Sequence, residues 1–390
     1  MGPLVHHGAG SAALHPVPDL TAPPRHDSAC RLAADRFGLP ATASNKITRP
    51  RNHQQATLTR HIPRPRRHAT SASAPSTLPA SGKQLPHSRI GGSRLSDRYG
   101  EAQTLNSLAN VLVLRSDWKQ AADHYQQSLV IKRELGNHPG QAQTLSNLGG
   151  VFARQHQNEQ AIDHFRQGLV IAREANDPHL QGQILSSLGN LLHRQGNWQE
   201  ASDHYWQALT IQQKLGDRHG QAQALINLAN LLAHQDQPEQ AEDAYQRALK
   251  FLRELGDRHG QAQALTNLGI LLVDQGQPEQ AEDAYRQALT IHQQLGSRHG
   301  EAQALINLGS LFALQGKWSL ATKNYNQALT VFRELGDLLA QAQTEYNLGL
   351  ALADQGQSRQ SAEHWRMALT IFEQLDAPEA EQVRRKLRLA

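Results

Sequence analysis

Residues 221–260 read QAQALINLANLLAHQDQPEQAEDAYQRALKFLRELGDRHG, and the next forty residues, 261–300, agree with them at 26 of 40 positions. The same period continues in both directions without an insertion or deletion, so that units begin at residues 101, 141, 181, 221, 261, 301 and 341. A period of about 20–50 residues is typical of solenoids and other repeat arrays. We therefore predict seven stacked copies of one structural unit.

Each unit carries two apolar stripes with the spacing of an α-helix. In residues 221–260, Leu225, Leu228 and Leu232 share one helix face. The second stripe contains Ala241, Tyr245, Ala248, Leu249, Leu252 and Leu255. The segment 235–238 between the stripes ends in a proline suited to a first helical turn, and Gly256-Asp257 can end one helix and cap the next. This pattern predicts an all-α protein, an α-solenoid of antiparallel helix pairs.

The composition agrees with many small helices and no single large core. Aromatic residues make up 5% of the chain, apolar residues 38% and charged residues 19%. No stretch approaches the roughly 20 apolar residues of a membrane-spanning helix, and the first Lys or Arg is Arg25, with no apolar run of a secretory signal after it. The single cysteine, Cys30, has no partner for an internal disulfide. We expect a cytoplasmic protein that does not enter a membrane.

Residues 1–94 differ from the rest of the chain. They are rich in Pro, Ser, Ala, His and Arg, and carry 13 Lys and Arg against 3 Asp, whereas the remaining residues carry 26 basic against 32 acidic ones. The absence of apolar periodicity predicts a disordered segment. Its positive charge could contact nucleic acid, an acidic partner or the acidic array, or the segment could be an inert extension without function, for example one from a mis-assigned start site.

The boundaries of the array follow from the repeat and its edges. We predict the array over residues 95–375, because LSDRYG at 95–100 echoes LGDRHG at 215–220 and reads as the broken end of an earlier unit. Residues 376–390 place Val383 and Leu387 on one helix face and charges elsewhere. A helix of this kind is expected to cap a solenoid, whose end units lack a neighbour.

One set of positions in each unit resembles the tetratricopeptide consensus. In residues 221–260 it consists of Leu228, Ala229, Leu232, Ala241, Tyr245, Ala248 and Leu249, and it recurs at 268–289 and 308–329. The resemblance covers about 101–375. The 40-residue length and the Asn-Leu-Gly/Ala signature resemble the repeats of kinesin light chains, of spindle-orientation adaptors and of arrays attached to bacterial signalling ATPases. The resemblance implies a right-handed superhelix whose concave wall is formed by the first helix of each unit.

Some units depart from the consensus. Ser116 and His156 stand where a glycine is usual between the two helices, and Ser361 and Trp365 replace an alanine and a tyrosine of the second helix. We therefore expect the first, second and last units to pack less regularly than the others.

The polar face of the first helix is the candidate binding site. Gln223, Asn227 and Asn230 lie away from the leucine stripe. Equivalent amides in the other units are Gln143, Asn147, Gln183, Asn190, Gln263, Asn267, Gln303, Asn307, Gln343 and Asn347. Amide groups both donate and accept hydrogen bonds, so such a ladder can bind the backbone of an extended peptide. Alternatively, these residues bond neighbouring helices and recur because the units were copied.

Charge varies along the same face. Arg154 and Arg194 are its basic candidates, and Asp274 and Asp354 occupy the equivalent positions of later units. A clamp for a terminal carboxylate, which chaperone-binding members of the resembled family carry, is therefore not expected. A groove that is basic early and acidic late would instead set the direction of a bound ligand.

Metal and catalytic sites are not expected. Aligned histidines such as His124, His164 and His204 sit in successive units, about 10 Å apart, whereas zinc ligands lie about 2.1 Å from the ion. The chain contains no phosphate-binding glycine loop, no metal-ligand motif on a helix and no nucleophile elbow. We expect no enzyme activity and no cofactor.

These observations favour an adaptor or scaffold that binds a partner peptide or helix in its concave groove. A second interpretation is a sensor array that regulates a signalling ATPase or another effector on a separate chain. Nucleic-acid binding comes third and depends on residues 1–94 alone. The partner's identity and the oligomeric state stay open at this level.

Overall fold

The computed structural model describes residues 88–389, so the predicted disordered segment lies outside the described residues up to residue 87, and its last residues, 88–94, begin a helix. Within 88–389 there are fifteen helices and no strand. They are α2 (Ser88–Leu114), α3 (Trp118–Glu134), α4 (His138–Arg154), α5 (Asn158–Glu174), α6 (Pro178–Arg194), α7 (Trp198–Leu215), α8 (Arg218–His234), α9 (Pro238–Glu254), α10 (Arg258–Asp274), α11 (Pro278–Gln294), α12 (Arg298–Leu314), α13 (Trp318–Leu335), α14 (Leu338–Asp354), α15 (Ser358–Gln374) and α16 (Glu379–Leu389). The prediction of an all-α solenoid is confirmed.

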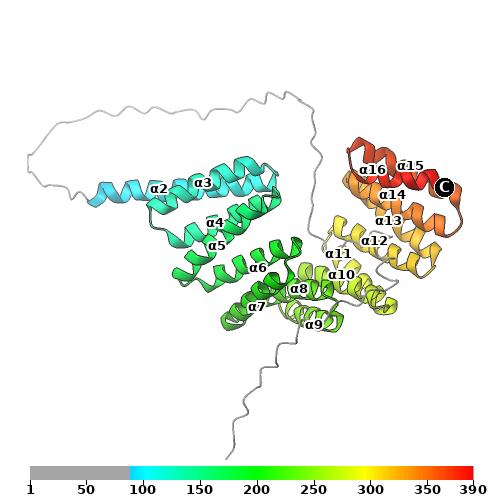
Figure 1. The fold of residues 1–390 in the computed structure, drawn as a ribbon, viewed down its shortest axis with the longest axis horizontal. Helices are drawn as coiled ribbons and strands as arrows, with labels where there is room; N and C mark the ends of the chain where they lie inside the picture. The colour runs from blue at the N-terminus through cyan, green and yellow to red at the C-terminus, as the bar shows by residue number, and fades with distance from the viewer. Residues whose placement is uncertain (1–87, 390) are drawn as a thin grey trace, which may run out of the picture.

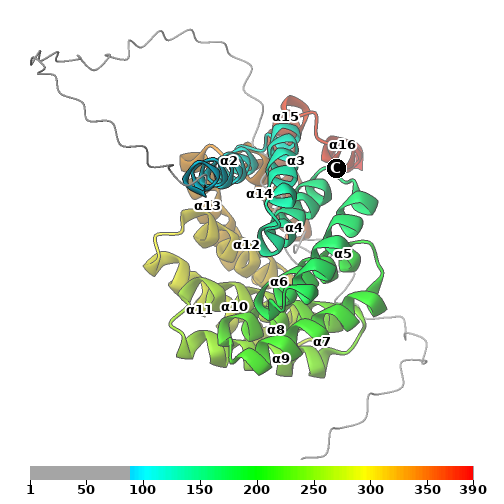
Figure 2. The ribbon, with the colours of Figure 1, turned by 90° about the vertical axis from the view of Figure 1, so that its left-hand side faces the viewer.

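The helices form consecutive antiparallel pairs, from α2 with α3 to α14 with α15, followed by α16 (Figure 1). Figures 1 and 2 show the pairs following a curved path, with α8 and α9 near its middle. First helices also touch the first helices of neighbouring units, as α4 touches α6 and α6 touches α8. The even-numbered helices therefore line the inner wall of the superhelix, and the odd-numbered helices form the outer wall.

Short turns between the helices follow the predicted residue types. Asp217 accepts a hydrogen bond from the Gly220 amide at 2.9 Å, and Asp257 caps α10 in the same way at 2.8 Å. Gly256, just before this cap, has a φ of +68°, a left-handed conformation that glycine adopts without strain. These turns set the angle between successive pairs and hence the direction in which each first helix faces.

Small residues permit close helix packing, as the sequence predicted. A Cβ atom on Gly269 would lie 2.4 Å from Cε1 of Tyr285, so the tyrosine ring rests directly on the backbone of α10. Gly309 and Tyr325 repeat this contact two helices further on. The tyrosines are fully buried and fill the space between the two helices of each pair.

The departures from the consensus keep the local geometry of the other units. Ser116 and His156 adopt φ values of +63° and +61°, the left-handed conformation that Gly276 has at +69°. Trp365 is buried and takes the place of the tyrosine, with its ring against Gly349. The less regular packing expected for these units is therefore not seen in their interhelical turns or in the seat of the aromatic ring.

The two edges of the array differ. Residues 95–100 lie inside the continuous helix α2, whereas the similar residues 215–220 end α7 and begin α8. At the other edge α16 packs on α15, with Val383 buried and Leu387 partly buried against the core.

Candidate functional site

The inner wall presents a row of glutamines, which we call the glutamine column. It consists of Gln143, Gln183, Gln223, Gln263, Gln303 and Gln343, one from each of the helices α4 to α14. Gln303 is half-buried and the other five are exposed. Their side-chain amides are therefore open to a ligand along the whole inner wall.

The asparagines one turn further along the same helices lie deeper. This asparagine column consists of Asn147, Asn227, Asn267, Asn307 and Asn347. Asn147 is half-buried, Asn227 is 8% exposed and Asn307 is 0% exposed. Gln143 and Gln223 donate to the Oδ1 atoms of Asn147 and Asn227 at 3.1 and 3.3 Å. Among the described residues, Nδ2 of Asn227 and both polar atoms of Asn307 have no hydrogen-bond partner.

A third set of polar residues, including Asn190 and Asn230, bonds the core tyrosines. Asn190 accepts a hydrogen bond from the Tyr205 hydroxyl at 2.7 Å. Asn230 accepts from the Tyr245 hydroxyl and, at 3.1 Å, from Nδ2 of Asn267 in the next unit. These two candidates thus connect helices and units.

The sequence analysis missed this tyrosine partner position, although a signal existed. The partner stands fifteen residues before the aromatic residue, and Ser310 fills the same role for Tyr325 at 3.0 Å. Where the partner position holds Gly150, the aromatic residue is Phe165, which has no hydroxyl group to satisfy. The pattern fails for Tyr285, whose buried hydroxyl has no hydrogen-bond partner among the described residues, so this position identifies packing amides in some units only.

The C-terminal ends of the first helices carry the charges of the groove. Arg154 and Arg194 are exposed on α4 and α6, and Arg154 stacks over the ring of Trp118 at 5.2 Å. Asp274 is half-buried on α10 and Asp354 is exposed on α14. The charge at this repeat position therefore changes from positive in Arg154 and Arg194 to negative in Asp274 and Asp354.

A histidine pair lies between the basic and acidic parts. The rings of His193 and His234 meet edge to face with their centroids 5.1 Å apart. Burial, together with the charge of His234, lowers the pKa of His193 to about 4. His193 is therefore neutral at pH 7 and adds no charge to the groove.

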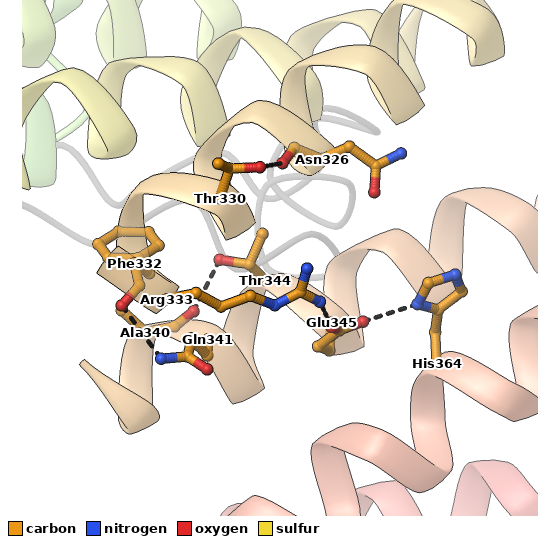
Figure 3. Close-up of polar contacts among 9 residues, drawn as sticks. All are labelled: Asn326, Thr330, Phe332, Arg333, Ala340, Gln341, Thr344, Glu345 and His364. Atoms are coloured by element: carbon orange, nitrogen blue, oxygen red, sulfur yellow. Dashed lines mark hydrogen bonds and ion pairs between the residues drawn. The ribbon is translucent and has the colours of Figure 1, made fainter. Parts of the chain in front are cut away.

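A buried carboxylate joins the last two units (Figure 3). Glu345 on α14 is 3% exposed, and its Oε1 accepts a hydrogen bond from Arg333 of α13 at 2.9 Å. Its Oε2 lies 2.6 Å from Nδ1 of His364 on α15. The other six units have leucine at the position of Glu345, and this contrast is visible in the sequence, although the sequence analysis did not single it out.

No group of three or more His, Cys, Asp or Glu side chains between residues 88 and 389 is arranged to hold a metal ion. None of the helices α2 to α16 has the length and apolar character needed to cross a membrane. The site residues predicted from the sequence lie on the first helices of the units, α4 to α14.

These features define a helical-repeat solenoid with a polar inner wall. The tetratricopeptide-repeat family model matches residues 100–174, 180–254, 221–294, 260–334 and 300–374, and this chain belongs to that family. Members of the family are in general non-catalytic scaffolds for protein–protein interaction. No curated protein matches the sequence.

Solved structures share the fold at low sequence identity. The apo form of RapI is 15% identical, and the match covers 74% of this chain and 100% of RapI with a TM-score of 0.56. A signal-transduction ATPase with a tetratricopeptide-repeat sensor from Pyrococcus horikoshii is 13% identical over 74% of this chain and 47% of its own, with a TM-score of 0.56. The apo form of the quorum sensor NprR from B. thuringiensis is 13% identical over 73% and 82%, with a TM-score of 0.55.

Proposed function

We propose that this protein is a cytoplasmic adaptor or scaffold that binds a segment of a partner protein along the inner wall of its superhelix. The single observation that carries the proposal is the glutamine column, because five of its six amides are exposed on one continuous wall. The Nε2 atoms of Gln143, Gln183 and Gln223 bond to side chains four residues away on their own helices. Binding of an extended chain or a helix uses this arrangement directly.

The spacing of the column fits an extended ligand. Neighbouring helices lie about 8–10 Å apart, and a strand rises about 3.3 Å per residue. Each glutamine could therefore meet the backbone at about every third residue of a bound peptide. The half-buried asparagines behind the column, such as Asn147, hold the glutamines through Oδ1 and so limit the orientations of their amides.

The charges of the groove add direction to this proposal. Arg154 and Arg194 would attract the acidic part of a ligand towards α4 and α6, and Asp274 and Asp354 would attract a basic part towards α10 and α14. A ligand with one acidic and one basic end therefore binds in one orientation. Replacing both arginines with Ala is expected to weaken the binding of such a ligand.

The test uses matched variants of the full chain. Gln183, Gln223 and Gln263 are replaced together by Ala, and the control variant replaces three exposed glutamines of the outer wall, Gln207, Gln246 and Gln327. Partners are captured from a lysate of the source organism, identified, and their affinities for each variant measured. We expect at least a tenfold loss of affinity for the inner-wall variant alone, about 1.4 kcal/mol. Equal binding by both variants would sink the proposal.

A second function is supported by the structural neighbours. The Pyrococcus horikoshii protein carries its repeats as a sensor on an ATPase, and NprR is a quorum sensor. By analogy of fold, this array could bind a signal and act on an effector of a separate chain. An effector whose activity changes when this protein is added, and changes again with the groove variant, would favour the sensor over a passive scaffold.

A further inference from the structure

A crevice opens on the outer wall, away from the glutamine column. It has a volume of about 430 Å³ and lies between the end of α9, the start of α10 and the middle of α11. Three arginines line it, Arg253, Arg258 and Arg286, against one carboxylate, Asp283. The array as a whole carries more acidic than basic residues, so this concentration of arginine stands out locally.

Arg258 lacks the carboxylate that its equivalents have. Arg98, Arg218 and Arg298 hold the equivalent position in the repeat; Arg218 and Arg298 begin α8 and α12, and Arg98 lies inside α2. Each forms an ion pair with a glutamate at the end of the second helix of its own unit, Glu134, Glu254 and Glu334 respectively. Arg258 instead donates to two neutral amides, Gln261 at 3.0 Å and Gln294 at 2.5 Å. Its positive charge is therefore not neutralised inside its unit.

Arg253, like Arg258, has no carboxylate partner among the described residues. Its equivalent two units later is Arg333, which binds the buried carboxylate of Glu345 on α14 (Figure 3). In the crevice between α9, α10 and α11 the position of Glu345 is taken by Leu265. Among the described residues, no carboxylate pairs with Arg253.

The remaining charges do not cancel these two arginines. Arg286 is already paired with Glu282 on its own helix, at 2.7 Å. Asp283 is exposed on α11 and is the one carboxylate in the lining. Arg253 and Arg258, from two different helices, thus line a space where, at one repeat position, only the last unit of the array has a carboxylate, Glu345. Arginine pairs of this kind bind carboxylate and phosphate oxygens strongly.

We propose that the crevice between α9, α10 and α11 binds an oxyanion presented by an acidic side chain of a partner protein, through Arg253 and Arg258. The glutamate carboxylate is the favoured form, because Arg333, the equivalent of Arg253, already binds the carboxylate of Glu345. A phosphate group shares this chemistry. This outer-wall site is separate from the inner-wall groove, so a partner could engage both at once.

The first experiment measures binding of a fluorescein-labelled hexaglutamate peptide to the full chain by anisotropy at about 0.15 M salt. We expect Arg253→Gln with Arg258→Gln to weaken binding at least tenfold. The control replaces Arg133 and Arg173 with Gln. These arginines hold the repeat position of Arg253 in earlier units and lie outside the crevice. This control removes the same charge and should leave the affinity within about twofold. An equal loss in both variants, or no binding by the native chain of this peptide or of its phosphoserine counterpart, overturns the proposal.

The second experiment supplies the missing carboxylate from the chain itself. Leu265→Glu copies Glu345 and should place a carboxylate beside Arg253, so that the labelled peptide loses at least tenfold in affinity. Circular dichroism checks that the variant is folded; if it is not, the arginine comparison decides alone. A folded Leu265→Glu variant with native affinity would contradict the proposal.

Two further measurements distinguish a phosphate ligand from a carboxylate ligand, and the crevice from the inner-wall groove. Competition by inorganic phosphate at lower concentration than by acetate would indicate a phosphorylated side chain as the natural ligand, and the reverse order a carboxylate. Because the groove beside Arg154 and Arg194 would also attract an acidic peptide, the crevice substitutions are repeated in the inner-wall variant at Gln183, Gln223 and Gln263, where they should cause the same tenfold loss. The proposal for the crevice and the proposal for the inner-wall groove can therefore be refuted separately.

Discussion

The first helix of the array, α2, and a central first helix, α8, have apolar residues at the same positions but bury them differently. Leu108 and Val111 on α2 are 43% and 51% exposed, whereas Leu228 and Leu231 on α8 are 2% and 0% exposed. The side chains differ little, so the difference comes from the neighbour, since α8 packs behind a preceding unit. Whether an apolar side chain is buried in this fold therefore depends on whether its unit packs against a neighbouring unit.

The C-terminal end of the array also lacks a neighbouring unit, but there a further helix covers it. There α16 covers the last unit, with Val383 1% exposed and charged residues on its outer face. The described part of the chain contains no such helix next to Leu108 and Val111. The comparison between covered and uncovered positions leads to the following predictions.

The largest effect is expected from leucine truncation in a covered joint. Leu228→Ala removes a buried side chain between two units and should lower the free energy of unfolding by about 3 kcal/mol. Leu108→Ala, at the uncovered edge, should cost less than about 1 kcal/mol because that side chain is already half in water. Urea unfolding followed by circular dichroism measures both. Similar losses at the two positions would mean that something covers α2 in solution.

A smaller effect is expected at the capped edge. Val383→Ala on α16 should lower the free energy of unfolding by about 1–2 kcal/mol, because a buried contact with α15 is lost. Val111→Ala is the matched control, with an expected loss below about 0.5 kcal/mol. If the two variants melt at the same temperature, α16 does not act as a stabilising cap.

The helices and their joints could be read from the sequence because their causes are local. The 3.6-residue periodicity and the turn residues predicted the helix pairs, and the predicted break at 235–238 lies between α8 and α9. The depth of the amides could not be read in this way. A helix face shows Gln223 and Asn227 side by side, but superhelical curvature brings the next first helix close and buries the asparagine alone.

The Glu345 cluster shows a second limit of sequence reading. A glutamate at a leucine position is a visible anomaly, but its partners Arg333 and His364 are 12 and 19 residues away on different helices. Their convergence depends on the crossing of α13, α14 and α15 (Figure 3). The same is true of the arginines in the outer-wall crevice, which come from three helices.

The covered part of the array should also respond to pH. Burial and the charge of His234 lower the pKa of His193 to about 4, below the ordinary value of about 6.5. Between these two pH values the unfolded chain binds more protons than the folded chain, so stability falls as the pH decreases through this window. His193→Asn should make the fall less steep, whereas the same change at the exposed His138 should not. Melting temperatures between pH 7 and pH 4 test this, and parallel curves for the native chain and His193→Asn would contradict it.

The smallest predicted effect concerns the turns of the first two units. Ser116 has a φ of +63°, a conformation that costs a side-chain-bearing residue about 1 kcal/mol and costs glycine nothing. Ser116→Gly should therefore raise the free energy of unfolding by about 0.5 kcal/mol, after allowance for the greater freedom of glycine in the unfolded chain. Ser107→Gly, in the middle of α2, is the opposite case and should lower it by about the same amount, because glycine weakens a helix interior. The two serines are nine residues apart and both exposed. Changes of opposite sign in the free energy of unfolding would show that the turn conformation limits stability here. A decrease for both variants would show that Ser116 stabilises its turn by other means.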